Sequence, residues 1–178
     1  SSSWILIALF GCIPFFLSDS IMNFTDSFFE SMSGVTTTGS SVIQNISNKS
    51  EGILIWRALL QWLGGVGIIV MALSILPVLQ VGGMQVFRAE SSDTTEKILP
   101  RTAQISTAVI IIYCILTFSC FALYWIFGMN AFDSFAHSMT TIATGGFSTK
   151  NTSIAFFDNA YIEYLSLIHI SEPTRLGF

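Results

Sequence analysis

Long stretches without charged residues dominate the pattern of the chain. Residues 1–18, 58–87 and 102–132 contain no Asp, Glu, Lys or Arg. Crossing a hydrocarbon core takes about 20 apolar residues, so the second and third stretches predict two membrane spans. The apolar run at residues 4–17 is short for a span. We interpret it as the end of a longer membrane helix, because a signal peptide would bring a basic flank and a small-residue cleavage site.

A short amphipathic segment lies between the first apolar run and the first long span. It covers residues 24–35 and would form about 18 Å of helix at ~1.5 Å per residue, too short to cross a bilayer. We predict a re-entrant half-helix with Asp26 near its first turn, where a carboxylate suits the helix N-terminus. A helix lying on the outer surface is the alternative. The following loop is poor in charge and rich in Thr and Gly, which favours the re-entrant interpretation.

The half-helix and its loop occur twice. Residues 26–41 (DSFFESMSGVTTTGSS) and 133–148 (DSFAHSMTTIATGGFS) align without a gap at an offset of 107, and eight of the sixteen positions are identical. Repeats inside membrane proteins are typical of quasi-symmetric transporters, whose binding site lies between the repeats. We therefore predict a second half-helix that begins near Asp133.

Composition narrows the class further. The 178 residues are 52% hydrophobic and only 10% charged, whereas a soluble domain carries about 25% charged residues. A formal net charge of −4 argues against a nucleic-acid partner, which would require a basic surface. The three cysteines, Cys12, Cys114 and Cys120, lie in apolar runs without a CxxC pair, so neither a disulfide framework nor a zinc site is indicated.

The repeated Thr/Gly loops carry the candidate chemistry. Non-helical backbone at membrane depth survives where it is buried in protein or lines a water-filled path, because unpaired N–H and C=O groups are costly in hydrocarbon. Gly39, Gly145 and Gly146 permit dihedrals that other residues avoid, so successive carbonyls can face one axis and replace the water shell of a monovalent cation. The negative C-terminal end of each half-helix favours a cation on this path.

Four segments together carry a family resemblance: FFESMSGVTTTGSS at residues 28–41, QWLGGVGIIV at 61–70, ILPVLQVGGMQVFRAE at 75–90 and FGMNAFDSFAHSMTTIATGGFST at 127–149. With them the chain resembles, over residues 4–164, the membrane subunits of the Trk/Ktr/HKT potassium-uptake superfamily, most closely those of bacterial Trk systems. The resemblance implies an all-α polytopic membrane protein with potassium-channel-like span, pore-helix and span units around one pathway. Two of the four units would be present, so we expect the sequence to be a fragment.

Residue by residue, the resemblance implies a potassium-binding filter made of backbone carbonyls. Its members would be Thr37, Thr38, Gly39, Thr144, Gly145 and Gly146, flanked by Thr36, Ser40 and Phe147. The implied function is potassium uptake across the bacterial cytoplasmic (inner) membrane, with potassium as the transported ion and no cofactor in this chain. The implied partners are the lipid membrane, a second copy in a homodimer and a cytoplasmic nucleotide-binding regulatory subunit. Transport of sodium or another monovalent cation by the same fold is the alternative.

Two functions from other classes are more distant. An intramembrane enzyme would need a Ser–His pair or two facing aspartates, but Asp26 and Asp133 lie at the starts of the two half-helices with no evident partner. We therefore expect no enzyme. A passive membrane module would leave the repeated loops facing lipid rather than protein and ions.

The expected organisation has four parts. Residues 1–79 form the first unit with a truncated first span, and residues 80–101, which hold Arg88, Lys97 and Arg101, form a cytoplasmic loop by the positive-inside tendency. Residues 102–164 form a second unit that lacks its second span, which would begin near Ala160. Residues 165–175 (LSLIHISEPTR) look like the translation of a sequencing adapter, and a Pro and charges there are costly in a span. We exclude 165–178 from the expected fold.

Several other residues carry expectations. We expect Arg57 to extend to the outer interface or to pair with a nearby acid such as Glu51, with a buried functional role as the alternative. His137 aligns with Glu30 across the repeat, and we expect it to pack within its half-helix rather than to handle protons. The three glycines of QWLGGVG, Gly64, Gly65 and Gly67, are expected to let neighbouring segments approach the span closely.

Overall fold

The computed structural model describes residues 2–18, 23–79 and 98–169, and every regular element in these ranges is helical. The α-helices are α1 (Ser2–Gly11), α2 (Ile13–Leu17), α3 (Phe24–Val35), α4 (Glu51–Leu79), α5 (Ile98–Ile126), α6 (Ala131–Ile142) and α7 (Ala160–His169). Two 3₁₀ turns, Ile46–Asn48 and Ser153–Phe157, lie in the connections. The all-helical fold class is therefore confirmed for the described residues.

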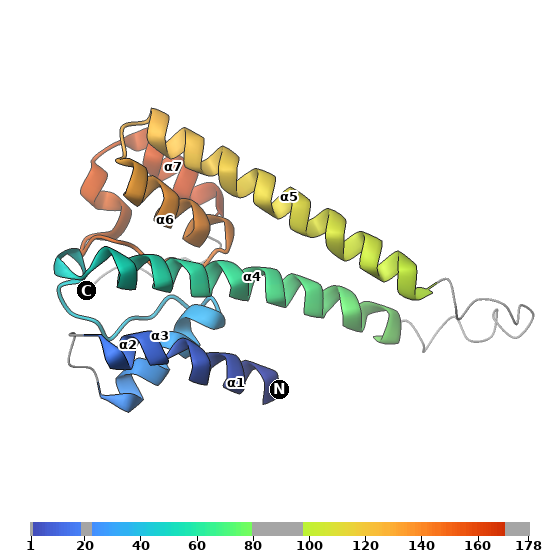
Figure 1. The fold of residues 1–178 in the computed structure, drawn as a ribbon. Coiled ribbons are helices and arrows are strands. Elements are labelled where there is room, and N and C mark those ends of the chain that lie inside the picture. The colour runs from blue at the N-terminus through green and yellow to red at the C-terminus, as the bar shows by residue number, and fades with distance from the viewer. Residues whose placement is uncertain (1, 19–22, 80–97, 170–178) are drawn as a thin grey trace, which may run out of the picture.

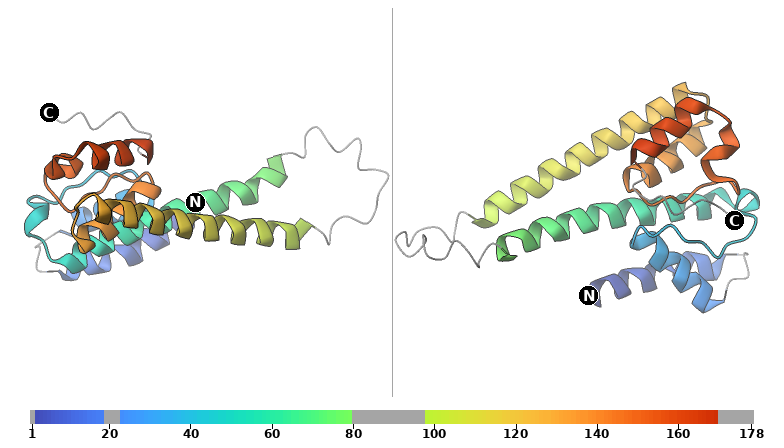
Figure 2. Two further views of the ribbon diagram at one scale, coloured as in Figure 1. Left: turned by 90° about the horizontal axis from the view of Figure 1, so that it is seen from above. Right: turned by 180° about the vertical axis from the view of Figure 1, so that it is seen from behind.

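The long helix α4 separates the other helices into two groups (Figure 1). Helices α1 to α3 lie on one side of it, and α5 to α7 lie on the other. The two long helices α4 and α5 extend together well beyond the short ones, as both views in Figure 2 show. Because α4 packs against both α3 and α6, it is positioned to hold the two half-helices relative to each other.

Three buried clusters hold this arrangement. One joins the first group to α4 through Phe15, Val35, Ile53 and Leu60. Another joins α5 to α7 through Cys120, Tyr124, Met129 and Ile162. The third joins α4 to α6 through Ala58, Ala136 and Met139, with Trp62 packed against it. Ala58 and Ala136 of the third cluster are small, so the axes of α4 and α6 can approach closely at these positions.

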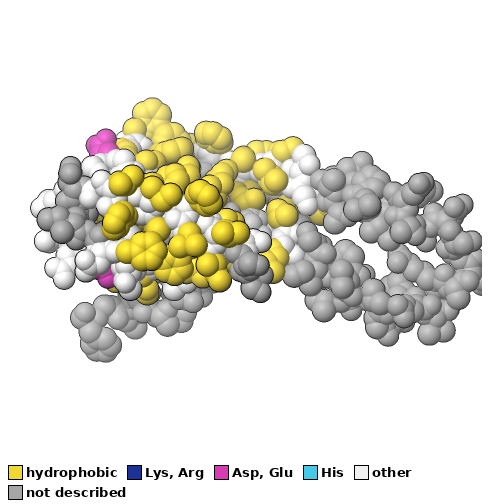
Figure 3. All heavy atoms as spheres, turned by 60° about the horizontal axis from the view of Figure 1, so that its bottom comes forward, with side chains coloured by type: hydrophobic (Ala, Val, Ile, Leu, Met, Phe, Trp, Pro, Cys, Tyr) yellow, Lys and Arg dark blue, Asp and Glu magenta, His cyan; other side chains and the backbone are white. Residues whose placement is uncertain are grey.

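Among the residues that the structure describes, two helices are long and apolar enough to cross a membrane. Their apolar segments, Glu51–Ala72 and Ile105–Ile126, are 22 residues each, and only 39% and 22% of their most apolar windows are buried. Large apolar side chains such as Phe118 and Ile126 are 67% and 74% exposed, and Figure 3 shows apolar side chains gathered over one face. A soluble monomer rarely exposes so much apolar surface, whereas lipid or further helices would cover it.

The predicted boundaries hold at the half-helices and fail at the spans. Helix α3 covers residues 24–35 as expected, and α7 begins at Ala160 as expected. However, α4 begins at Glu51, before the charge-free run, and α5 begins at Ile98, inside the predicted loop at residues 80–101. A charge-free run therefore does not mark where a span begins, because charges near a helix end can reach water and Arg57 inside α4 is paired with a buried carboxylate. The remainder of the predicted loop, residues 80–97, lies outside the described residues.

The exclusion of residues 165–178 was too broad at its start. Helix α7 continues to His169, Leu165 packs against the cluster around Tyr124, and Ser166 is buried. Because Ile162 anchors the first turn of α7 in the same cluster, the following turn is held close to α5. Residues 170–178 lie outside the described residues, and the adapter interpretation of this segment stays a prediction.

Candidate functional site: the two repeat loops

Each half-helix leads into a loop with the same backbone hydrogen bonds. We call residues 36–41 the first repeat loop and residues 143–148 the second. The first begins with three bonds of 2.9 Å, which run from Thr36 N to Met32 O, Thr37 N to Gly34 O and Thr38 N to Ser33 O. The second has the equivalents 107 residues later, from Ala143 N to Met139 O, Thr144 N to Thr141 O and Gly145 N to Thr140 O, at 2.9–3.1 Å. The sequence repeat is therefore also a repeat of local structure.

The backbone dihedrals repeat as well. Thr37 and Thr144 have φ of 55° and 53°, and Gly39 and Gly146 have φ of 76° and 72°. A threonine with positive φ is uncommon because its Cβ meets the backbone, so its recurrence in both loops marks a specific conformation. When residues with left-handed and right-handed backbone conformations alternate, neighbouring carbonyls can point to the same side of the chain. In a β-strand they point to opposite sides.

Gly145 is required for a reason that the sequence did not suggest. Its φ is not among the positive ones, so it does not serve as a permissive turn residue. A Cβ at Gly145 would instead overlap the side-chain amide of Gln61. Conformational freedom was therefore the wrong explanation at Gly145, although it was correct for Gly39 and Gly146.

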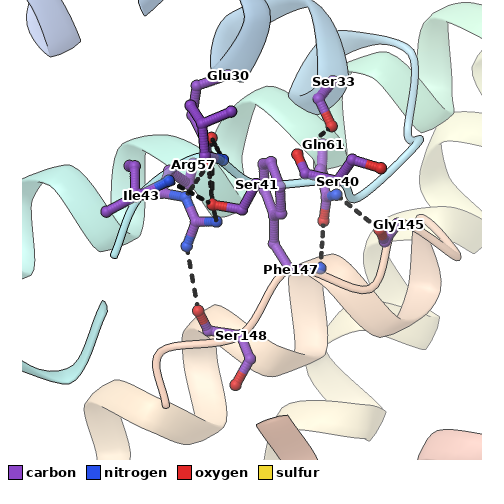
Figure 4. Close-up of polar contacts among 11 residues, drawn as sticks. Glu30, Ser33, Ser40, Ser41, Ile43, Arg57, Gln61, Gly145, Phe147 and Ser148 are labelled. Atoms are coloured by element: carbon purple, nitrogen blue, oxygen red, sulfur yellow. Dashed lines mark hydrogen bonds and ion pairs between the residues drawn. The ribbon is translucent and has the colours of Figure 1, made fainter. Parts of the chain in front are cut away.

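Gln61 on α4 binds the second repeat loop at two points (Figure 4). Its Nε2 donates to the carbonyl of Gly145 at 2.7 Å, and its Oε1 accepts from the backbone N–H of Phe147 at 3.1 Å. The Gln61 side chain is fully buried. A buried amide is costly unless both of its ends are hydrogen-bonded, and here both are. We call these two bonds the Gln61 bridge.

A buried ion pair lies one helical turn away on the same helix. Arg57 Nε donates to Glu30 Oε1 at 2.7 Å, and the two side chains are 2% and 0% exposed. We expected Arg57 at the interface or paired with a nearby acid such as Glu51; it is instead buried, and its acidic partner is Glu30, 27 residues away. Glu30 on α3 offers a buried carboxylate, while Glu51 lies exposed in the first turn of α4.

The Arg57 guanidinium also joins the ends of both repeat loops (Figure 4). Its Nη2 donates to Ser41 Oγ at 3.0 Å, and its Nη1 donates to the carbonyl of Ser148 at 3.2 Å. It also lies 4.0 Å from the centroid of the Phe147 ring. These contacts offset the desolvation of the buried cation. The two loops therefore converge on α4 instead of separating on the outer face.

Glu30 and His137 occupy equivalent positions and make equivalent contacts. Glu30 accepts from Ser41 Oγ at 2.9 Å and from the backbone N–H of Val42 at 3.1 Å. His137 Nε2 lies 2.9 Å from the hydroxyl of Ser148, which is the residue 107 positions after Ser41. Each side chain thus fixes the end of its own repeat loop. The buried position of His137 agrees with the predicted packing role, and Glu30 shares that position in the first unit.

Glycines on α4 allow the close approach of the half-helix ends. A Cβ at Gly64 would overlap the carbonyl of Val35, the last residue of α3, and a Cβ at Gly65 would lie 3.2 Å from Ala143 at the end of α6. The expectation for these two glycines is confirmed. A Cβ at Gly67 would instead lie 3.2 Å from the indole of Trp4, so this glycine serves the contact between α4 and α1.

The remaining predicted residues lie around this arrangement with different exposure. Gly39, Gly145 and Phe147 are buried, Thr36, Thr37 and Gly146 are half-buried, and Thr38, Ser40 and Thr144 are exposed. Sequence reasoning missed the roles of Gln61 and Glu30 and misplaced Arg57. The available signal was the spacing of Arg57 and Gln61, two polar residues one turn apart on a predicted span, since helical residues four apart share a face.

Fold and site together define a class: a helical membrane protein with paired half-helices whose loops meet on one long helix. The chain matches the TrkH family, described as cation transport protein, over residues 1–171. It is 44% identical to the Trk system potassium uptake protein TrkH of Escherichia coli K12 over 170 residues, which is 94% of this chain and 35% of that protein. It is 43% identical to TrkI of Halomonas elongata over 166 residues, covering 93% of this chain and 33% of that protein.

A solved structure agrees with these relatives. The crystal structure of the potassium transporter TrkH from Vibrio parahaemolyticus superimposes with a TM-score of 0.80 and 40% sequence identity, over 94% of this chain and 33% of that one. The chain belongs to the TrkH family of cation transport proteins, so it falls in a transporter family and not in an enzyme family. The chain spans about a third of the length of the relatives that it matches.

Proposed function

We propose that this chain forms two of the four units of a potassium-uptake transporter and that its repeat loops supply half of the ion-binding filter. The observation that carries the proposal is the duplicated loop geometry. Three backbone hydrogen bonds and two positive φ values recur at an offset of 107 residues, in segments that meet on α4. Potassium is favoured as the substrate because the named relatives are potassium uptake proteins.

The proposed ion ligands are the backbone carbonyls of the predicted filter residues. They are Thr37, Thr38, Gly39, Thr144, Gly145 and Gly146, with Thr36, Ser40 and Phe147 beside them. The carbonyl of Gly145 also accepts a hydrogen bond from Gln61, and because a carbonyl oxygen has two lone pairs, one remains for an ion. Carbonyl oxygens from four such loops would replace the hydration shell of the ion. The negative ends of α3 and α6 precede the loops and favour a cation.

The setting of the complete protein is part of the proposal. We place it in the bacterial cytoplasmic (inner) membrane as a multi-pass protein, working as a homodimer with a cytoplasmic nucleotide-binding regulatory subunit. Half of a four-unit ring leaves the ion with too few ligands. For this reason the chain by itself should not conduct, and all transport experiments below use the complete protein that contains it.

A glycine substitution tests the proposal. Gly146 has a φ of 72°, and a Cβ added there would meet no other atom within 4 Å, so Gly146→Ala strains the loop without a steric clash. We expect potassium-dependent growth of an uptake-deficient host to fall, because an alanine in this region costs about 1–2 kcal/mol and shifts the adjacent carbonyls. Gly128 is a matched control, since it has a φ of 101°, open space around it and a position outside both repeat loops.

The outcomes of this experiment are distinct. Loss of potassium uptake in Gly146→Ala with wild-type amounts of protein, and retained uptake in Gly128→Ala, supports the proposal. Wild-type uptake in both variants contradicts the filter assignment. A flux assay in which sodium competes with potassium identifies the substrate. Equal uptake of sodium and potassium would favour the alternative of a general monovalent cation transporter.

A further inference from the structure

Gln61 is an unusual residue for its place in the chain. Between residues 58 and 72, α4 contains no other Asn, Gln, Ser, Thr or charged residue. An amide in the apolar interior destabilises a helix contact unless its hydrogen bonds are made. Gln61 makes both with backbone groups of the other unit, 84 and 86 residues away in the sequence. The residue therefore joins two units through the main chain of the second repeat loop.

The Gln61 bridge restrains the second repeat loop on both sides of a residue with a positive φ. It binds the carbonyl of Gly145 and the N–H of Phe147, so Gly146 lies between its two anchor points. Gly146 carries the positive φ of 72°. Two hydrogen bonds that bracket one residue restrict both peptide planes beside it. The orientation of the Gly145 and Gly146 carbonyls is therefore coupled to the position of the Gln61 amide.

The bridge also explains a difference between the two repeats. The residue equivalent to Gly145 in the first loop is Thr38, which is exposed. A side chain at position 145 would overlap the amide of Gln61, so the second loop accepts only glycine at this point while Gln61 is present. The glycine and the glutamine form a matched pair.

The first repeat loop is closed in another way. Ser33 Oγ of its own half-helix donates to the carbonyl of Ser40 at 2.6 Å. The equivalent of Ser33 in the second unit is Thr140, whose Oγ1 donates instead to the carbonyl of His137 within α6, at 3.1 Å. The second loop therefore does not repeat the closing bond of the first, and the Gln61 bridge stands in its place.

From these observations we infer that Gln61 is a positioning residue that sets the ion discrimination of the second repeat loop. The inference rests on the proposed function, because it assigns a role at the same ion-binding loops. The donor Nε2 holds the Gly145 carbonyl toward α4, and the acceptor Oε1 holds Phe147. Removal of the amide releases the Gly145 carbonyl to rotate, which changes the number and spacing of oxygens available to a passing cation.

The test compares two glutamines in the complete protein. Gln61→Met keeps the length and volume of the side chain but removes both hydrogen bonds. Gln44→Met makes the same change at an exposed position of the connection before α4. We expect Gln61→Met to change the ratio of potassium to sodium uptake about tenfold, on the scale of one lost buried hydrogen bond, and Gln44→Met to leave the ratio unchanged.

A second variant guards against loss of folded protein. Gln61→Glu keeps the shape of the side chain and an oxygen for the Phe147 N–H while it removes the amide donor to Gly145. We expect it to shift the ion ratio in the same direction as Gln61→Met. A purely structural role would lower the amount of protein and leave the uptake ratio per molecule at the wild-type value.

The outcomes separate this inference from the proposed function. If the wild type discriminates potassium from sodium and both Gln61 variants keep that ratio, Gln61 does not set discrimination and the inference is overturned. If the wild-type protein shows no cation uptake at all, the proposed transport function itself is contradicted. A changed ratio in either Gln61 variant, with normal behaviour of Gln44→Met, supports the inference.

Discussion

Removing one partner of the Arg57–Glu30 pair should destabilise the protein more than removing both. Arg57→Met leaves the Glu30 carboxylate 0% exposed and without its counter-ion. An uncompensated buried charge costs about 3–5 kcal/mol when one partner of such a pair is removed. Arg57→Met also deletes the hydrogen bonds to Ser41 and Ser148 that join the repeat loops. The loss is a large part of a typical folding free energy of about 5–15 kcal/mol.

The double variant provides the decisive comparison. Glu30→Met combined with Arg57→Met places two apolar side chains of similar length in the buried site and leaves no charge there. Because buried ion pairs can be replaced by apolar residues at little cost, we expect the double variant to unfold at a higher temperature than Arg57→Met alone. Potassium uptake should remain low in both variants, since neither can join the ends of the two loops.

Lys150→Met is the matched control for removal of a cation. Lys150 Nζ lies 3.0 Å from Asp133 Oδ2, but the lysine side chain is 22% exposed. Asp133 is itself 3% exposed, but it keeps hydrogen bonds from Thr149 Oγ1 and Asn130 Nδ2 and its lysine partner reaches solvent, so this substitution should lower the unfolding temperature clearly less than Arg57→Met does. Thermal unfolding of the complete protein in detergent measures all three variants. The reasoning is refuted if Arg57→Met behaves like Lys150→Met, or if the double variant is less stable than Arg57→Met.

Two further predictions concern local stability and are checked in the same unfolding assay. Asn130 caps α6 through a side-chain bond to a backbone N–H, whereas Asn23 makes no such bond at α3; Asn130→Ala should cost about 1 kcal/mol and Asn23→Ala clearly less, and equal losses would contradict the capping argument. Gly64→Ala would drive its Cβ into the carbonyl of Val35 and should cost about 1–3 kcal/mol by overpacking. Gly52→Ala meets nothing within 4 Å and should be neutral or slightly stabilising, so similar losses at both glycines would exclude close packing as the cause.

Much of the architecture follows from local sequence signals. The half-helix at Phe24–Val35 and the start of α7 at Ala160 were predicted because apolar periodicity, helix-end carboxylates and Thr/Gly loops act over a few residues. The repeat at an offset of 107 residues predicted that both loops would share one conformation. Gly39 and Gly146 were identified as residues of special backbone geometry, since glycine is the residue that adopts positive φ without strain.

The contacts that join the two units were decided by the tertiary structure. Arg57 pairs with Glu30, 27 residues away, and not with the nearby Glu51, while Gln61 reaches a carbonyl 84 residues away. A single sequence shows that α4 carries two polar residues on one face, but not which groups face them. The polar groups that pair in the interior are those that the fold brings within hydrogen-bonding distance, because only a hydrogen-bonded partner offsets the loss of water on burial. That distance is set when α4 packs between α3 and α6.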